Sequence, residues 1–179
     1  MSIELLDRTR KVSNILSQAR SEKIEFSEMC DVVSEYLDSS VYIFSKRGKL
    51  LGVSTSKDAG SLPGFVDEVG EFLDKKINDR FLGVLSTNEN VNLETLGFEE
   101  YDVEGITALI APLVVSGQRL GTFFLYRREK TYRIDDIVFC EYCNTVVGLL
   151  LTNSLIVEIG EETNKREAIS SAITTLTEL

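Results

Sequence analysis

The strongest constraint on the fold is a pair of long β-type runs joined by a very short turn. Residues 106–115 and 119–127 are rich in β-branched and aromatic side chains, and Ser116-Gly117-Gln118 between them suits a tight hairpin turn. A similar pair occurs earlier, where residues 41–44 and 50–54 flank a basic turn that contains glycine. Two hairpins of this kind predict an antiparallel sheet, with the second hairpin at its centre.

Apolar residues recur at three- and four-residue spacing in four further stretches, which is typical of amphipathic helices. The expected helices cover residues 3–19, 27–37 and 63–76, and a C-terminal stretch that starts near Ile134. The last pattern resumes beyond Gly160 and continues toward the C-terminus. A helix of this length outlasts the domain and suits a connector or a dimer seam.

Residues 78–105 form a polar, irregular stretch between the two hairpins. A connection this long in a compact domain usually serves as a lid or a binding loop. The order of elements predicts an α+β fold, an antiparallel sheet with flanking helices on one face and a long C-terminal helix. GAF and PAS sensor modules share this order. We expect a ligand-sensing domain over residues 1–155 and a helical linker over 156–179.

Charge and residue composition limit the classes of function that the chain can have. The chain carries 19 basic and 29 acidic residues, and its net charge of −10 disfavours direct contact with DNA or acidic membranes. Histidine, the most common general base near neutral pH and a frequent zinc ligand, is absent. We therefore expect no catalytic residue and no metal site. Three cysteines and the lack of an apolar run of about 20 residues indicate a cytoplasmic protein with reduced thiols.

Four motifs follow one another along the chain: LLDRTR at 5–10, SKRGKLLG at 45–52, RLGT at 119–122, and an Asp135-Asp136 helix start that leads to TVVG at 145–148. Together they resemble the CodY family of nutrient-responsive transcription regulators. Residues 168–179 resemble the linker before that family's winged helix-turn-helix. We therefore expect the DNA-binding domain to follow where this chain ends.

The resemblance implies a GAF domain that binds a branched-chain amino acid, usually isoleucine, as its effector. It implies GTP as a second effector in some members. It also implies a transcription repressor that is a homodimer at full length and contacts DNA only through its C-terminal domain. No enzymatic activity and no bound cofactor are expected.

The ligand-binding region departs from the family pattern. Relatives that bind isoleucine hold its carboxylate with an arginine after the first hairpin and with a lid that carries Thr-x-Phe-Pro. Here residues 57–65 contain no arginine, and residues 96–99 contain no proline. Tyr42 replaces a pocket-lining phenylalanine, so its hydroxyl needs a partner if it is buried. The candidate ligand-binding residues are Tyr42, Phe65, Phe72, Phe98 and, as the nearest cation, Arg80. For the phenylalanines, ordinary core packing is the alternative.

Other interpretations stay open at this point. Cys140 and Cys143 have the CxxC spacing of redox and metal sites, so a GAF-fold thiol enzyme is one alternative and structural thiols are another. A degenerate sensor that serves mainly in dimerisation is also compatible with the long apolar helix. The basic turn at Lys46, Arg47 and Lys49 could meet a phosphate, although it lacks a P-loop pattern and also suits an exposed hairpin tip.

Overall fold

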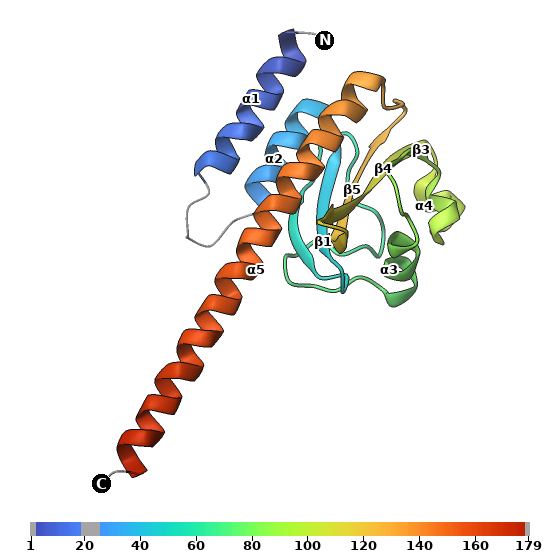
Figure 1. Cartoon of the computed structure of the whole chain (residues 1–179). Helices are drawn as coiled ribbons and strands as arrows, with labels where there is room; N and C mark the ends of the chain where they lie inside the picture. The colour runs from blue at the N-terminus through green and yellow to red at the C-terminus, as the bar shows by residue number, and fades with distance from the viewer. Residues whose placement is uncertain (1–2, 19–25, 178–179) are drawn as a thin grey trace.

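A computed structural model describes residues 3–18 and 26–177 of the chain (Figure 1). The elements in chain order are α1 (Ile3–Gln18), α2 (Phe26–Leu37), β1 (Ser40–Ser45), β2 (Leu50–Ser54), α3 (Lys75–Leu82), β3 (Asn88–Val91), the 3₁₀ helix η1 (Leu93–Leu96), α4 (Glu100–Val103), β4 (Ile106–Val115), β5 (Gln118–Arg128) and α5 (Ile134–Thr177). Both hairpins and the helices expected at 27–37 and from Ile134 are confirmed, as is the helix expected at 3–19 up to Gln18; residue 19 lies outside the described residues.

The strands form one antiparallel sheet in the order β2-β1-β5-β4-β3. Strand β5 lies at the centre, where Phe124 is opposite Tyr42 of β1 on one side and Ile110 of β4 on the other. Gly121 permits this pairing, because a Cβ at that position would lie 1.9 Å from the carbonyl oxygen of Phe44. The second hairpin is therefore central to the sheet, as the sequence predicts.

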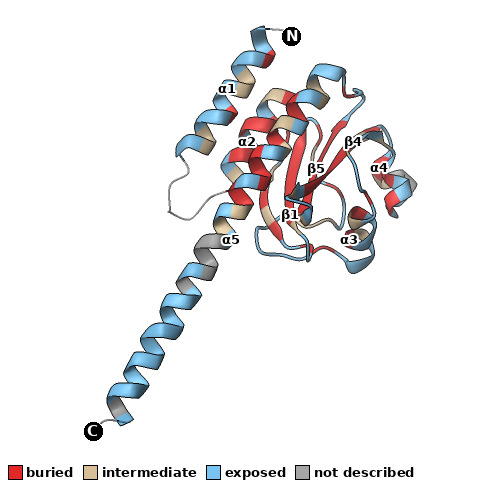
Figure 2. Cartoon of the chain, viewed as in Figure 1, coloured by how far each residue is buried: buried red, intermediate tan, exposed pale blue. Residues whose placement is uncertain are grey.

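The two faces of the sheet carry different cores, because alternate residues of a strand point to opposite sides. Helices α1, α2 and α5 cover one face (Figures 1 and 2). Their contacts on it are Val41, Ile43, Leu109, Ala111, Leu113, Phe123 and Leu125. The opposite face presents Tyr42, Phe44, Ala108, Ile110, Phe124 and Tyr126 to a second cluster. The expected helices on one face are present, but α3, η1 and α4 contribute to the core of the other face.

The helix expected at residues 63–76 is wrong. Gly64 and Gly70 have φ angles of 71° and 101°, a conformation that breaks a helix. The segment instead bonds to the first hairpin, where the Gly70 amide donates to the Leu50 carbonyl and the Leu50 amide to the Glu71 carbonyl, both at 2.8 Å. Helix-like spacing of Phe65, Val66, Val69, Phe72 and Leu73 was therefore misleading, and tertiary pairing determines the backbone.

The stretch expected to be irregular, residues 78–105, contains several short elements. Helix α3 is capped by Asp74, whose carboxylate accepts a bond from the Lys76 amide at 2.9 Å. Asn92 caps η1 in the same way, accepting from the Glu94 amide at 3.0 Å. Both are standard N-cap residue types, so these starts were readable from the sequence.

Helix α5 runs unbroken for 44 residues, about 65 Å at 1.5 Å per residue. Asp136 caps its start, accepting from the Arg133 amide at 3.0 Å, as the paired aspartates suggested. The helix continues through Gly160 without a break and projects beyond the sheet (Figure 1). Figure 2 shows that its packed half lies against the sheet and that the described side chains of the projecting half are exposed. The domain boundary near residue 155 stays a prediction.

Candidate ligand-binding site

Seven aromatic rings gather on the sheet face opposite α1, α2 and α5; we call them the aromatic cluster. Its members are Tyr42, Phe44, Phe65, Phe81, Phe98, Phe124 and Tyr126. The rings of Tyr42 and Phe65 lie 5.1 Å apart nearly edge to face, and those of Phe81 and Phe124 lie 5.0 Å apart. These spacings are those of attractive aromatic pairs. Tyr42, Phe44, Phe81, Phe124 and Tyr126 are fully buried, so the cluster is a packed apolar core with half-buried Phe65 and Phe98 at its edge.

The candidate residues do not all come together. Tyr42 lies buried in the aromatic cluster, and half-buried Phe65 packs on it. Phe98, in the loop after η1, contacts Phe65 at 5.7 Å between ring centroids, so these two rings come from two different loops and meet. Phe72 lies outside the cluster, with 55% of its surface exposed.

Arg80 lies beside the loop that carries Phe98. Its Nη1 donates to the Thr95 carbonyl at 3.1 Å, and its guanidinium lies against Gly97. The side chain is exposed, and the hydrogen bond to Thr95 is the only one found for it within the described chain. A guanidinium has five N–H donors, so Arg80 keeps donors for an anionic group at the rim of the cluster.

The hydroxyl of Tyr42 has the partner that burial requires. It lies 3.2 Å from the Tyr126 hydroxyl, which donates to the Gly60 carbonyl at 2.7 Å; the Tyr42 hydroxyl is therefore the donor to Tyr126. Ser40 donates to the same carbonyl at 2.9 Å. Burial raises the pKa of both phenols, and the nearby Tyr126 raises the pKa of Tyr42 further. The two tyrosines thus anchor the loop at Gly60 and stay neutral.

Arg119 fixes α3 to the sheet. Its guanidinium donates to the carbonyls of Val84 at 2.8 Å and Phe81 at 3.1 Å, and to the Thr122 hydroxyl at 3.1 Å. Partial burial lowers the pKa of the guanidinium. Because Phe81 belongs to the aromatic cluster, this arginine holds one wall of the cluster in place.

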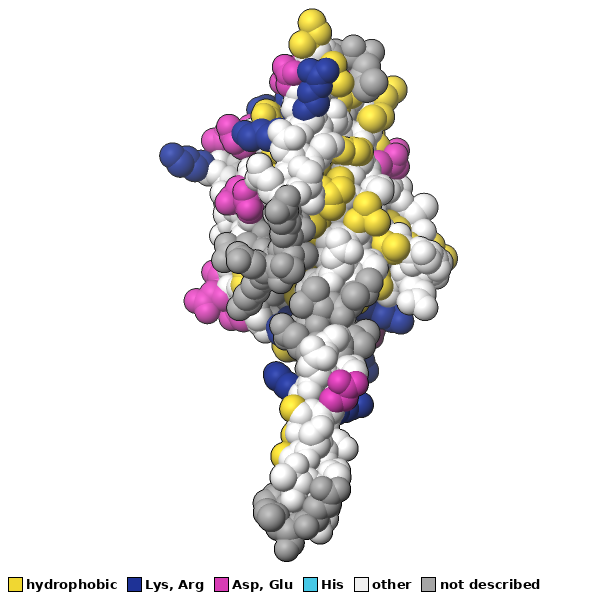
Figure 3. All heavy atoms as spheres, turned by 60° about the vertical axis from the view of Figure 1, so that its left-hand side comes forward, with side chains coloured by type: hydrophobic (Ala, Val, Ile, Leu, Met, Phe, Trp, Pro, Cys, Tyr) yellow, Lys and Arg dark blue, Asp and Glu magenta, His cyan; other side chains and the backbone are white. Residues whose placement is uncertain are grey.

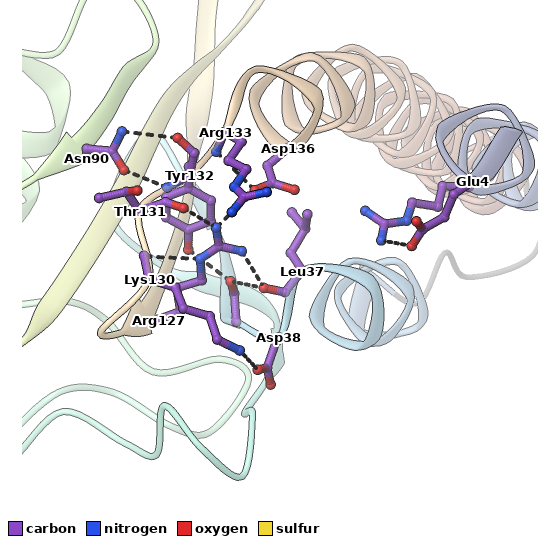
Figure 4. Close-up of polar contacts among 12 residues, drawn as sticks. Glu4, Leu37, Asp38, Asn90, Arg127, Lys130, Thr131, Tyr132, Arg133 and Asp136 are labelled. Atoms are coloured by element: carbon purple, nitrogen blue, oxygen red, sulfur yellow. Dashed lines mark hydrogen bonds and ion pairs between the residues drawn. The ribbon is translucent and has the colours of Figure 1, made fainter. Parts of the chain in front are cut away.

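Arg127 joins three elements at the other end of β5 (Figure 4). It is buried and donates to the Leu37 carbonyl at the end of α2 and, at 2.9 Å, to the carboxylate of Asp136 on α5. It also donates to the Thr131 carbonyl and lies over the Tyr132 ring, 4.2 Å from the centroid. Arg127 is two residues beyond Leu125 and four beyond Phe123, so it points to the same side of the sheet. A charged residue at such an inward position is the sequence signal for this site, but the sequence-based prediction did not include it.

Asn90 connects β3 to the segment that leads into α5; we call this contact the clasp. The Tyr132 amide donates to Asn90 Oδ1 at 2.7 Å, and Asn90 Nδ2 donates to the Tyr132 carbonyl at 3.3 Å (Figure 4). Asn90 has a φ of 55°, a conformation that asparagine tolerates better than most residues. Because Tyr132 also contacts Arg127, the clasp reaches the start of α5.

The three thiols lie on the other side of the sheet. Cys30, Cys140 and Cys143 are free and buried among the residues that α1, α2 and α5 pack. Burial raises the pKa of each thiol. Reactive cysteines have lowered pKa values and access to solvent, so this placement favours structural thiols.

No cluster of three metal-binding side chains occurs within the described ranges of the chain. None of the helices described there is long and apolar enough to span a membrane.

Comparison with known proteins gives a consistent result. Residues 4–175 match the family model described as CodY GAF-like domain. The global transcriptional regulator CodY of Caldanaerobacter subterraneus subsp. tengcongensis is 35% identical over 175 residues, which cover 96% of this chain and 67% of that protein. The CodY regulator of Listeria monocytogenes is 32% identical over 183 residues, which cover 96% of this chain and 68% of that protein.

Solved structures agree. The cofactor-binding GAF domain of the nutrient sensor CodY from Clostridium difficile superposes with a TM-score of 0.63 at 30% identity, covering 83% of this chain and 98% of that one. A GAF domain from an Acinetobacter phosphoenolpyruvate-protein phosphotransferase has the same TM-score at 14% identity over 88% of this chain and 99% of that one, a likeness of fold alone. The expected α+β GAF fold is confirmed.

Proposed function

The chain belongs to the CodY family, and from that premise we propose that it is the effector-sensing domain of a nutrient-responsive transcription regulator. The observation that carries the proposal is the division of the sheet: one face is packed with helices, and the other carries the aromatic cluster beneath two loops. The relative from C. difficile is described as a cofactor-binding domain of a nutrient sensor. Family membership favours regulation over catalysis.

We place a branched-chain amino acid, such as isoleucine, against the aromatic cluster. Its aliphatic side chain would lie on the apolar rings, after Phe65 and Phe98 part to admit it. The Arg80 guanidinium lies against Gly97, the residue before Phe98, and would take the carboxylate in place of the arginine that relatives carry elsewhere. The Tyr42 hydroxyl, deeper in the cluster and bonded to the Tyr126 hydroxyl, is a polar group that relatives with phenylalanine at position 42 lack.

A thermal-shift titration with isoleucine, leucine and valine tests this placement. A ligand that binds only the folded state stabilises it by about 2.7 kcal/mol at 100 times its dissociation constant. Arg80→Gln should lower the affinity for isoleucine at least tenfold. The control Lys76→Gln removes one charge from the same helix and should leave that affinity unchanged. Equal affinity in both variants would exclude Arg80 as the carboxylate anchor, and no shift with any of the three amino acids would exclude this ligand class.

GTP remains a proposed second effector. The basic turn with Lys46, Arg47 and Lys49 is exposed but held firmly, since Asn78 of α3 donates to the Lys46 carbonyl at 3.2 Å. A rigid, basic tip suits phosphate contact. Calorimetry with GTP should show binding that Arg47→Gln weakens and that Arg10→Gln, on distant α1, does not; equal binding by both variants would place GTP elsewhere.

Transmission is proposed to run through the clasp. The lid that carries β3 is joined by Asn90 to Tyr132, and Arg127 joins that segment to α5. A ligand that favours one arrangement of the lid would then favour one geometry of α5. Hydrogen exchange at the Tyr132 amide reports this directly: isoleucine should slow it in the native chain and leave it unaffected in Asn90→Ala.

We further propose a cytoplasmic homodimer that binds DNA through a C-terminal domain outside this chain. Hydrophobic side chains gather on the side formed by α1 and α5 (Figure 3), and the projecting part of α5 exposes Ile169 and Ile173. Analytical sedimentation of the native chain and of the Ile169→Glu/Ile173→Glu variant tests whether these two side chains lie in the dimer interface. Dimerisation without any effector binding would instead support a degenerate sensor that serves as a dimerisation module.

A further inference from the structure

A concave site lies apart from the aromatic cluster, at the edge of the sheet. It is a groove of about 610 Å³ formed by β3, η1, α4 and the start of β4. Strand β3 is the last strand of the sheet, so the groove opens at the edge opposite β2 (Figure 1). The lining residues are Asn90, Val91, Asn92, Glu94, Val103, Glu104, Gly105, Ile106 and Thr107. None of the seven aromatic rings is among them.

The lining combines an apolar floor with an acidic rim. Val103 and Ile106 are buried and belong to the same core cluster as the aromatic rings. Glu94 and Glu104 are exposed, and neither takes part in an ion pair within the described part of the chain. No lysine or arginine lines the groove. Arg128 lies beside the groove, where its Nη1 donates to the Glu104 backbone carbonyl at 3.3 Å, but the charged side chains of the lining itself are both carboxylates. The lining therefore disfavours an anionic ligand.

We infer that this groove binds a small aliphatic amine, with ammonium groups at Glu94 and Glu104 and methylene groups on Val103 and Ile106. A metal ion fits less well, because no group of three metal-binding side chains occurs in the described ranges. The volume also lies in the range of small-molecule sites, roughly 300–1,000 Å³, and far exceeds that of one ion. An amine with a short carbon chain satisfies both the rim and the floor.

The groove is also in contact with the clasp. Asn90 lines it and at the same time accepts the hydrogen bond from the Tyr132 amide at 2.7 Å. A ligand seated in the groove restricts Asn90 and so keeps Tyr132 bonded, which orders the segment before α5. An amine bound here would therefore bias the same helix as an effector in the aromatic cluster, from a separate site.

Titration of the ¹⁵N-labelled chain with 1,4-diaminobutane tests the inference by nuclear magnetic resonance. We expect saturable shifts in the amides of residues 90–94 and 103–107, and slower hydrogen exchange at Tyr132. Glu94→Gln/Glu104→Gln should weaken binding at least tenfold. The control Glu68→Gln/Glu162→Gln removes the same charge from exposed positions outside the groove and should bind as the native chain does.

Several results would overturn it. Equal weakening in both double variants would show a diffuse counterion effect, and equal shifts with uncharged 1,4-butanediol would show that charge is not recognised. Saturation of the same amides by Mg²⁺ would indicate a metal site. None of these experiments uses isoleucine, so failure of this inference can be distinguished from failure of the proposed effector site.

Discussion

Replacement of Arg127 by methionine tests how the sheet, α2 and α5 are held together. Arg127 and Asp136 form a largely buried ion pair at 2.9 Å, with side chains 10% and 17% exposed. Removing one partner of a buried pair costs about 3–5 kcal/mol, because the remaining charge is left without compensation. The Leu37 and Thr131 carbonyls also lose a charged donor. Methionine keeps most of the apolar stem, so we expect the free energy of unfolding to fall by about 3–5 kcal/mol.

Urea unfolding followed by far-ultraviolet circular dichroism measures this loss, since the chain contains no tryptophan. Arg10→Met is the matched control: its contact with Asp7 is exposed and 3.9 Å long, so it should cost less than about 1 kcal/mol. A double-mutant cycle with Asp136→Asn isolates the pair. A loss below about 1 kcal/mol for Arg127→Met, or single losses that simply add, would refute the reasoning.

Three further outcomes are expected. Gly121→Ala should prevent folding, because its Cβ would lie 1.9 Å from a β1 carbonyl oxygen. At Gly160 an added Cβ would meet no described residue outside its own helical turn within 4 Å, so Gly160→Ala should stabilise α5 by about 0.5–1 kcal/mol. Circular dichroism melts compare the two variants. Asn90→Ala removes both hydrogen bonds of the clasp, so it should lower the free energy of unfolding in urea by about 1–3 kcal/mol and speed hydrogen exchange at the Tyr132 amide. Stability should fall above about pH 10, because burial raises the pKa of folded Tyr42 and the unfolded chain releases its proton first; the urea midpoint should fall less steeply with pH in Tyr42→Phe.

Local patterns predicted most of the framework. Residues 106–115 and 119–127 form β4 and β5 because their β-branched and aromatic side chains suit a central strand pair, and a short turn sets the register. The long helix was equally clear, since its apolar repeat extends over many turns. The departure at 63–76 has a local cause in two glycines and a distant one in pairing with β2, and only the first was visible in the sequence.

The candidate site was predictable only in part. Tyr42 was predicted from its place in a recognisable hairpin, and the partner that its buried hydroxyl was expected to need is the Tyr126 hydroxyl. Phe72 shared the same apolar spacing as Phe65 but lies outside the cluster, because the backbone turns at Gly70. The clasp joins Asn90 to a residue 42 positions away, and no local pattern encodes such a contact.

The strength of the clasp suits a switch. Two hydrogen bonds of ordinary worth contribute about 1–3 kcal/mol together, which matches the usual range of coupling between sites. A much stronger link between Asn90 and Tyr132 would hold α5 in one geometry whatever the lid did. A much weaker one would be lost in thermal motion. A ligand that binds only one arrangement of the lid supplies about 2.7 kcal/mol at 100 times its dissociation constant, enough to decide whether a contact of this size stays closed.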